Sequence, residues 1–121
     1  MLLASQMLTA AVLLIHVYIV LLETVLFRSR GRKVFAVSAD MVDRLAPLMA
    51  NQGCYNGFLV AALVLGFAWP APEVALAFTV FGLGCVAVAG VFGALTVMSR
   101  IFFIQTVPAA LALVTLYLAL R

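Results

Sequence analysis

Charged side chains are scarce in this sequence: Asp, Glu, Lys and Arg make up 9% of its 121 residues, whereas 68% are hydrophobic. A soluble domain is about half apolar and about a quarter charged. Such a deficit excludes an ordinary soluble domain. The composition therefore predicts an integral membrane protein, and the length predicts a single domain.

Residues that bind metals or carry redox chemistry are equally few. The chain has one histidine, and its two cysteines, Cys54 and Cys85, fall in apolar segments without a CxxC or HExxH pattern. Cysteines of this kind usually act as small buried hydrophobic side chains, the alternative being a disulfide or redox pair. We expect no metal site, and the sequence indicates no particular cofactor.

Four long apolar segments account for most of the chain: residues 2–27, 45–69, 73–98 and 101–120. At ~1.5 Å per residue, each can cross a hydrocarbon core of ~30 Å. The first is too long for the apolar core of a signal peptide, so we expect it to remain as a span. The predicted fold class is all-α, a polytopic membrane protein forming a four-transmembrane-helix antiparallel bundle.

Basic residues gather at one edge of these segments, in the loop 28–44 and in a later link. They are Arg28, Arg30, Arg32, Lys33, Arg44 and Arg100. The positive-inside rule then puts this edge in the cytoplasm and both termini outside. We interpret the basic run as a topology signal and a contact for membrane lipid, with a ligand site as the alternative, and we expect no nucleic-acid partner.

Polar side chains interrupt the second segment between residues 50 and 59. Gln52, Tyr55 and Asn56 share one helix face by their i, i+3, i+4 spacing, and Asn51 lies beside them. An uncompensated polar group in lipid costs several kcal/mol, so we expect this cluster to have hydrogen-bond partners or a function.

The strongly polar residues of the other segments lie in the same half of the membrane. They are His16, Glu23, Arg100 and Gln105. Counting ~1.5 Å per residue, His16 is level with Tyr55 and Asn56. The same count puts Glu23 level with Asn51, Gln52 and Gln105. We therefore expect a polar pocket in the cytoplasmic half of the bundle.

An ionisable side chain within a membrane is a functional candidate by default. His16 and Glu23 are the candidate acid/base catalysts. The candidates for binding the polar end of a ligand are Asn51, Gln52, Tyr55, Asn56, Arg100 and Gln105. The alternative is a structural network in which Glu23 pairs with Arg100 or Arg30, and His16 with Asn56.

Small residues in the third segment predict close helix packing. Ala89 and Gly93, and likewise Gly90 and Ala94, are spaced four apart, which lets backbones approach in lipid. Because four short helices offer one chain only a thin core, we expect a homo-oligomer, either a dimer or a trimer.

Several stretches carry a resemblance to a known family. Residues 16–23, 30–35 and 51–59, with the glycine-rich third segment and residues 105–108, resemble a bacterial membrane family catalogued as domain of unknown function 1304. The resemblance covers nearly the whole chain and implies a location in the bacterial inner membrane. It implies no activity.

A second similarity, in topology, is to the MAPEG family of trimeric membrane enzymes of eicosanoid and glutathione metabolism. It rests on four spans, a long basic first loop and a polar start to the second span. Asn51 corresponds to an Asn of that family's motif. Asn56 lies near the position of its Glu, and Gly57 replaces its Pro. The similarity implies a shared topology and a trimer.

The leading functional hypothesis is an enzyme or binder acting on a lipophilic small molecule. The first alternative is a small oligomeric proton-coupled transporter of hydrophobic compounds, because Glu23 is a lone membrane carboxylate. The second is a structural membrane subunit. Whether the chain is an enzyme stays open at this point.

Overall fold

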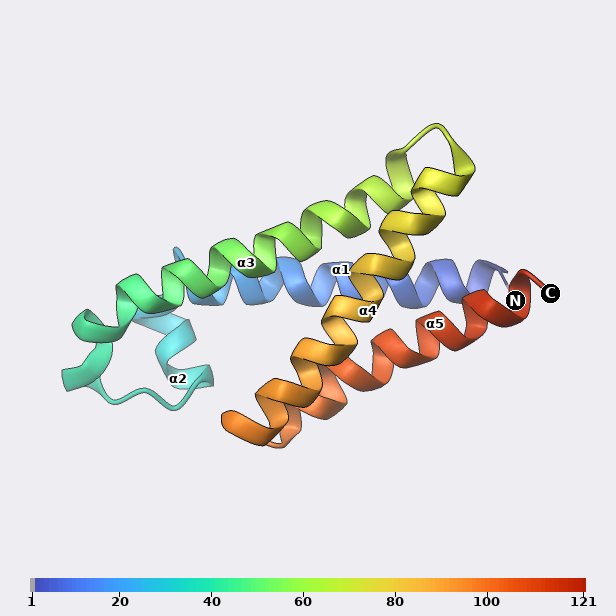
Figure 1. Cartoon of the computed structure of the whole chain (residues 1–121). Helices are drawn as coiled ribbons and strands as arrows, with labels where there is room; N and C mark the ends of the chain where they lie inside the picture. Colours follow the sequence, from blue (N-terminus) through green and yellow to red (C-terminus); the bar gives the residue numbers. More distant parts are fainter. Residues whose placement is uncertain (1) are drawn as a thin grey trace. The chain divides into compact units, whose positions relative to one another are not determined.

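The computed structural model describes residues 2–121, which are helical apart from short links (Figure 1). In chain order the elements are α1 (Leu2–Glu23), η1 (Phe27–Gly31), α2 (Arg32–Val34), η2 (Ala39–Met41), α3 (Val42–Ala68), α4 (Pro72–Thr96), η3 (Phe102–Thr106) and α5 (Val107–Ala119). The elements η1 and η3 are π-helical turns, and η2 is a 3₁₀ turn.

Four stretches are long and apolar enough to cross a membrane: Leu2–Glu23, Ala39–Ala68, Pro72–Thr96 and Phe102–Ala119. Since polar backbone groups in lipid must bond within their own segment, apolar helices of this length are the expected spanning elements. The predicted all-α membrane chain with four spans is confirmed.

Two helix ends differ from the sequence-based boundaries. The first helix stops at Glu23 rather than at residue 27, and α3 begins at Val42 rather than at residue 45. After Glu23 the bonding pattern changes, because the N–H of Leu26 bonds the Leu21 carbonyl, five residues back, at 2.9 Å. The Leu26 carbonyl then accepts the N–H groups of Arg30 and Gly31, which winds the chain into η1. The predicted loop 28–44 is therefore itself mostly wound into short turns.

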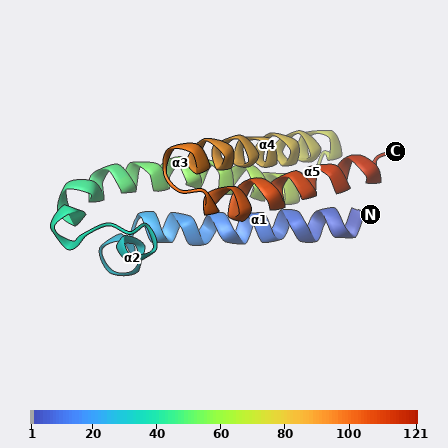
Figure 2. The same cartoon turned by 90° about the horizontal axis from the view of Figure 1, so that it is seen from below.

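Contacts group the chain into two compact units. Unit 1 contains the residues up to Ile15 together with Leu59–Arg121, and unit 2 is His16–Phe58. The core of unit 1 is made of buried aliphatic side chains: Val12, Leu63, Leu83, Val86, Ala109 and Ala112. Figures 1 and 2 show α4 and α5 side by side after their short link.

Glycines of α4 permit this packing, as the small-residue pattern predicts. A Cβ added at Gly90 would lie 2.8 Å from the backbone nitrogen of Thr106. The Thr106 hydroxyl donates to the Ala87 carbonyl at 3.0 Å. Gly84, by contrast, has no atom within 4 Å of an added Cβ. The glycines of α4 therefore divide into those that contact a neighbouring helix and those that do not.

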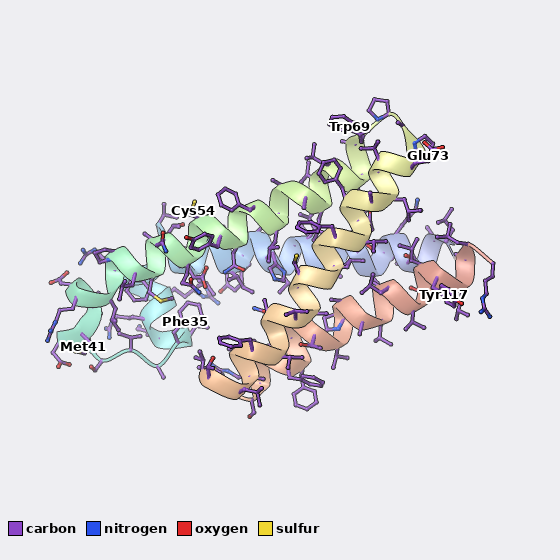
Figure 3. All side chains as sticks on the ribbon, viewed as in Figure 1. Phe35, Met41, Cys54, Trp69, Glu73 and Tyr117 are labelled. Atoms are coloured by element: carbon purple, nitrogen blue, oxygen red, sulfur yellow. The ribbon has the colours of Figure 1, made fainter. Side chains whose placement is uncertain are left out.

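Proline and tryptophan mark two special positions in unit 1, one inside the last span and one at a turn between spans. Pro108 has no N–H and cannot continue an α-helical ladder, and the widened turn η3 precedes it. Trp69 and Glu73 flank the turn between α3 and α4 (Figure 3), where Trp69 contacts the ring of Phe78 with centroids 5.8 Å apart. Tryptophan favours the membrane–water interface, which agrees with a turn between two candidate spans.

Candidate functional site

A carboxylate and an amide meet in unit 2, where the end of α1 lies against α3. Asn56 donates from Nδ2 to Oε2 of Glu23 at 2.7 Å. Glu23 is only 7% exposed, so the pair is largely shielded by the chain itself. A hydrogen bond to a carboxylate is stronger than one between neutral groups, so this contact ties α1 to α3.

The close approach of the two helices depends on Gly53, which lies one turn before Asn56. A Cβ added at Gly53 would lie 2.5 Å from Cγ2 of Thr24 and 3.3 Å from Cβ of Glu23. Thr24 is itself held, because its hydroxyl donates to the Val20 carbonyl at 2.6 Å. A larger side chain at position 53 would therefore push Asn56 away from Glu23.

The pairing corrects the depth expected from the sequence. Asn56 lies beside Glu23, whereas the count along the sequence put Glu23 level with Asn51, Gln52 and Gln105. Asn56 is roughly 21 Å along α3 from Val42. The first turns of α3 therefore extend past the end of α1.

The remaining polar residues of the α3 cluster are exposed. Asn51 and Gln52 are exposed, and Tyr55 is 57% exposed with its ring edge toward Phe58 at 6.1 Å between centroids. The stretch Ala39–Ala68 has 30 residues, or about 45 Å of helix, against a hydrocarbon core of ~30 Å. The stretch is thus longer than the hydrocarbon core, and we predict that Asn51 and Gln52 lie near the membrane edge, where polar groups are less costly.

The other candidates occupy different surroundings. His16 is completely buried in α1. Gln105 is half-buried in η3, which belongs to unit 1. Arg100 is exposed, and its Nε donates to the sulfur of Met98 at 3.0 Å. Participation of these residues in one site with Glu23 stays a prediction.

The basic residues make pairs that differ from the expected network. The guanidinium of Arg30 lies over the ring of Tyr18, 5.8 Å from its centroid, and Arg28 forms an ion pair with Asp43. The hydrogen bond from Asn56 to Glu23 is a pairing that the sequence did not suggest, and the pairings of Glu23 with Arg100 or Arg30 and of His16 with Asn56 stay predictions.

Sequence reasoning missed the residues that position the pair, above all Gly53 and Thr24. A signal for Gly53 was present, because it lies three residues before Asn56 and so on the same helix face. No sequence pattern points to Thr24, since its contact follows from where α1 ends.

The chemistry of the pair is that of hydrogen-bond recognition. Among residues 2–121, Asn56 is the one donor to the Glu23 carboxylate, which leaves Oε1 able to accept a further hydrogen bond. In that same part of the chain, no group of three or more His, Cys, Asp and Glu side chains is placed to hold a metal ion. The pair can hold an amine, hydroxyl or amide group of a ligand.

Comparison with known proteins assigns the chain to a family. No curated protein and no solved structure matches it. A family model does match, over residues 10–117, which is most of the chain and includes Glu23, Gly53 and Asn56. The chain therefore belongs to the family described as "Protein of unknown function (DUF1304)".

Proposed function

We propose that this membrane protein binds an amphipathic small molecule, as a binder or as an enzyme acting on it. The polar head of the ligand bonds to Glu23 and its apolar body lies among the spans. One observation carries the proposal: a 7% exposed carboxylate at the end of a membrane helix has a single donor among residues 2–121. A shielded carboxylate with remaining acceptor capacity favours a ligand that donates hydrogen bonds or carries a positive charge.

The proposal also includes a homo-oligomer in a bacterial inner membrane. Its support is the low burial of the spans, because the chain itself buries only 17–28% of their most apolar stretches. The exposed amides of Asn51 and Gln52 support it as well. Each carboxamide both donates and accepts, so a second copy offers suitable partners at the membrane edge.

Proton-coupled transport has less support. Glu23, the carboxylate that would carry the proton, is the last residue of α1 and so lies at one end of its span. A structural role for Glu23 is the remaining rival, since its hydrogen bond to Asn56 already links two helices.

Native mass spectrometry of the protein, extracted gently from its own membrane, tests the proposal. We expect a defined mass that is not a phospholipid in the wild type, and its loss in Glu23→Gln. The matched control is Glu73→Gln, which makes the same change at an exposed position in the first turn of α4. The control should keep the mass.

Two results would count against a ligand at Glu23. One is that the wild type, Glu23→Gln and Glu73→Gln all retain only bulk phospholipid, which would favour the structural role. The other is a fall in thermal stability of Glu23→Gln so large that its folded fraction disappears. The same spectra give the number of subunits, and a monomer in every preparation would contradict the proposed oligomer.

A further inference from the structure

The turn that follows α1 forms a basic hollow, which the Glu23–Asn56 pair does not line. The hollow has a volume of about 400 Å³ and is lined by Arg28, Ser29, Arg30, Arg32 and Lys33. All of its lining residues belong to unit 2. Five polar or charged side chains from six successive positions surround one depression and form a site that the proposed function does not use.

The backbone gives the hollow a fixed curvature. The Leu26 carbonyl accepts the N–H groups of Arg30 at 3.0 Å and of Gly31 at 2.8 Å. Gly31 rests directly on the Leu22 carbonyl oxygen, where a Cβ would collide with backbone. Phe27 is 1% exposed and anchors the same turn. The basic side chains therefore stand on a wound and anchored turn rather than on an extended loop.

The charges of the hollow are only partly compensated within unit 2. Arg28 pairs with Asp43, and Arg30 lies over the Tyr18 ring. Within residues 2–121, neither Arg32 nor Lys33 forms an ion pair with an acidic side chain. The hollow therefore has a surplus of positive charge, which favours an anionic ligand.

The hollow also lies next to the end of a stretch that could cross a membrane. Its residues begin five positions after Glu23, where the first span ends. Arg30 reaches back to Tyr18, which lies within that span. A tyrosine near a helix end and a cluster of arginines beside it are typical of the membrane interface, where the phosphates of lipids are concentrated.

We propose that the basic hollow binds the phosphate group of an anionic membrane phospholipid. Guanidinium groups donate paired hydrogen bonds to phosphate oxygens, and the lysine ammonium adds a point charge. The Ser29 hydroxyl already donates to the Leu26 carbonyl at 3.2 Å, so the guanidinium and ammonium groups supply the donors to the phosphate. The open depression of about 400 Å³ leaves room for a phosphate group beside these side chains.

Lipid binding to the purified full-length protein tests this assignment. The probes are phosphatidylglycerol and phosphatidylcholine with identical acyl chains, and native mass spectrometry counts the bound molecules. The test variant is Arg32→Gln combined with Lys33→Gln, and each single substitution is also measured. We expect the wild type to retain phosphatidylglycerol in preference to phosphatidylcholine, with retention weakened roughly fivefold for each charge removed.

Arg44→Gln is the matched control, because it removes one exposed charge of unit 2 outside the hollow. It should retain phosphatidylglycerol like the wild type. Equal loss in Arg44→Gln and Arg32→Gln would overturn the site, because the effect would then be one of general charge. Equal retention of the two lipids by the wild type would overturn it too. Displacement of the phospholipid by millimolar inorganic phosphate would overturn the assignment to a lipid.

Discussion

Gly53 decides, at the scale of single residues, whether Glu23 and Asn56 can meet. Its missing side chain leaves room for Thr24, whose Cγ2 would lie 2.5 Å from an added Cβ. Thr24 cannot easily turn aside, because its hydroxyl is bonded to the Val20 carbonyl and a β-branched side chain has few rotamers. The contact between the helices is therefore intolerant of even one extra methyl group.

We predict that Gly53→Ala destabilises the protein by about 1–3 kcal/mol, the usual cost of overpacking. The measurement is thermal unfolding of the purified protein in detergent. Gly57→Ala is the control on the same helix, because nothing lies within 4 Å of an added Cβ there. The control should be unchanged or more stable by up to ~1 kcal/mol, owing to the better helix propensity of alanine. Equal midpoints of thermal unfolding for Gly53→Ala and Gly57→Ala would show that Gly53 does not determine the contact between α1 and α3.

Sequence alone identifies these polar residues but not their pairing. Glu23 and Asn56 are conspicuous because a polar group in an apolar helix is costly. Their contact, however, depends on the relative depth of two helices, and an error of one turn in a helix end changes the partner. Such an error arose because the chain leaves the helix after Glu23, at a turn with no hydropathy signal.

The π-helical turn η1 controls the geometry of the loop between α1 and α3 at the scale of elements. Its last residue, Gly31, is buried and rests on the Leu22 carbonyl oxygen. Farther along, Ala36 has a left-handed φ of 55° and closes α2. The N–H of Val37 bonds the Arg32 carbonyl at 2.7 Å, as in the usual end of a helix. Both turns keep the basic residues close to the end of α1.

Replacement of Gly31 by alanine should open this loop. The collision is with a backbone oxygen, which cannot move aside as a side chain can, so we predict that η1 separates from α1. Limited trypsin digestion measures the opening, because Arg28, Arg30, Arg32 and Lys33 are its cleavage sites. We expect cleavage at least several-fold faster in Gly31→Ala than in the wild type or in Gly57→Ala. Unchanged rates would mean that the loop is already open without the substitution.

Elements are predictable from the sequence to different degrees. The four spans follow from hydropathy, because the cost of transfer to lipid adds up residue by residue along α1, α3, α4 and α5. The turns η1 and η3 are not predictable in this way. The turn η1 depends on the close contact of Gly31 with a backbone carbonyl, and η3 depends on the missing N–H of Pro108. The sequence shows these two residues but not the contacts that they allow.

Sidedness is a property of the whole molecule, and the lysine and arginine distribution predicts it. The loop between α1 and α3 and the link after α4 contain nearly all of the basic residues, while the opposite edge has Arg121 and the acidic Glu73. Translocating such a basic loop is unfavourable, so it should remain in the cytoplasm.

Fusions to the C-terminus test this orientation in a bacterial host. We predict that alkaline phosphatase fused after Arg121 is active and that green fluorescent protein at the same place is dark, because only the phosphatase matures outside the cytoplasm. The same two reporters fused within residues 36–39 should behave the other way round, with an inactive phosphatase and a fluorescent green fluorescent protein. A fluorescent C-terminal fusion would place both termini in the cytoplasm and reverse the predicted topology.

The lone tryptophan has a spectroscopic consequence. Because Trp69 is the single indole of the chain and packs on Phe78 beside the turn between α3 and α4, ultraviolet emission excited at the indole band reports on that turn alone. Quenchers attached at known depths along lipid chains would therefore locate this turn in the bilayer directly. The intrinsic fluorescence of Trp69 therefore measures the depth of this turn without an added fluorophore.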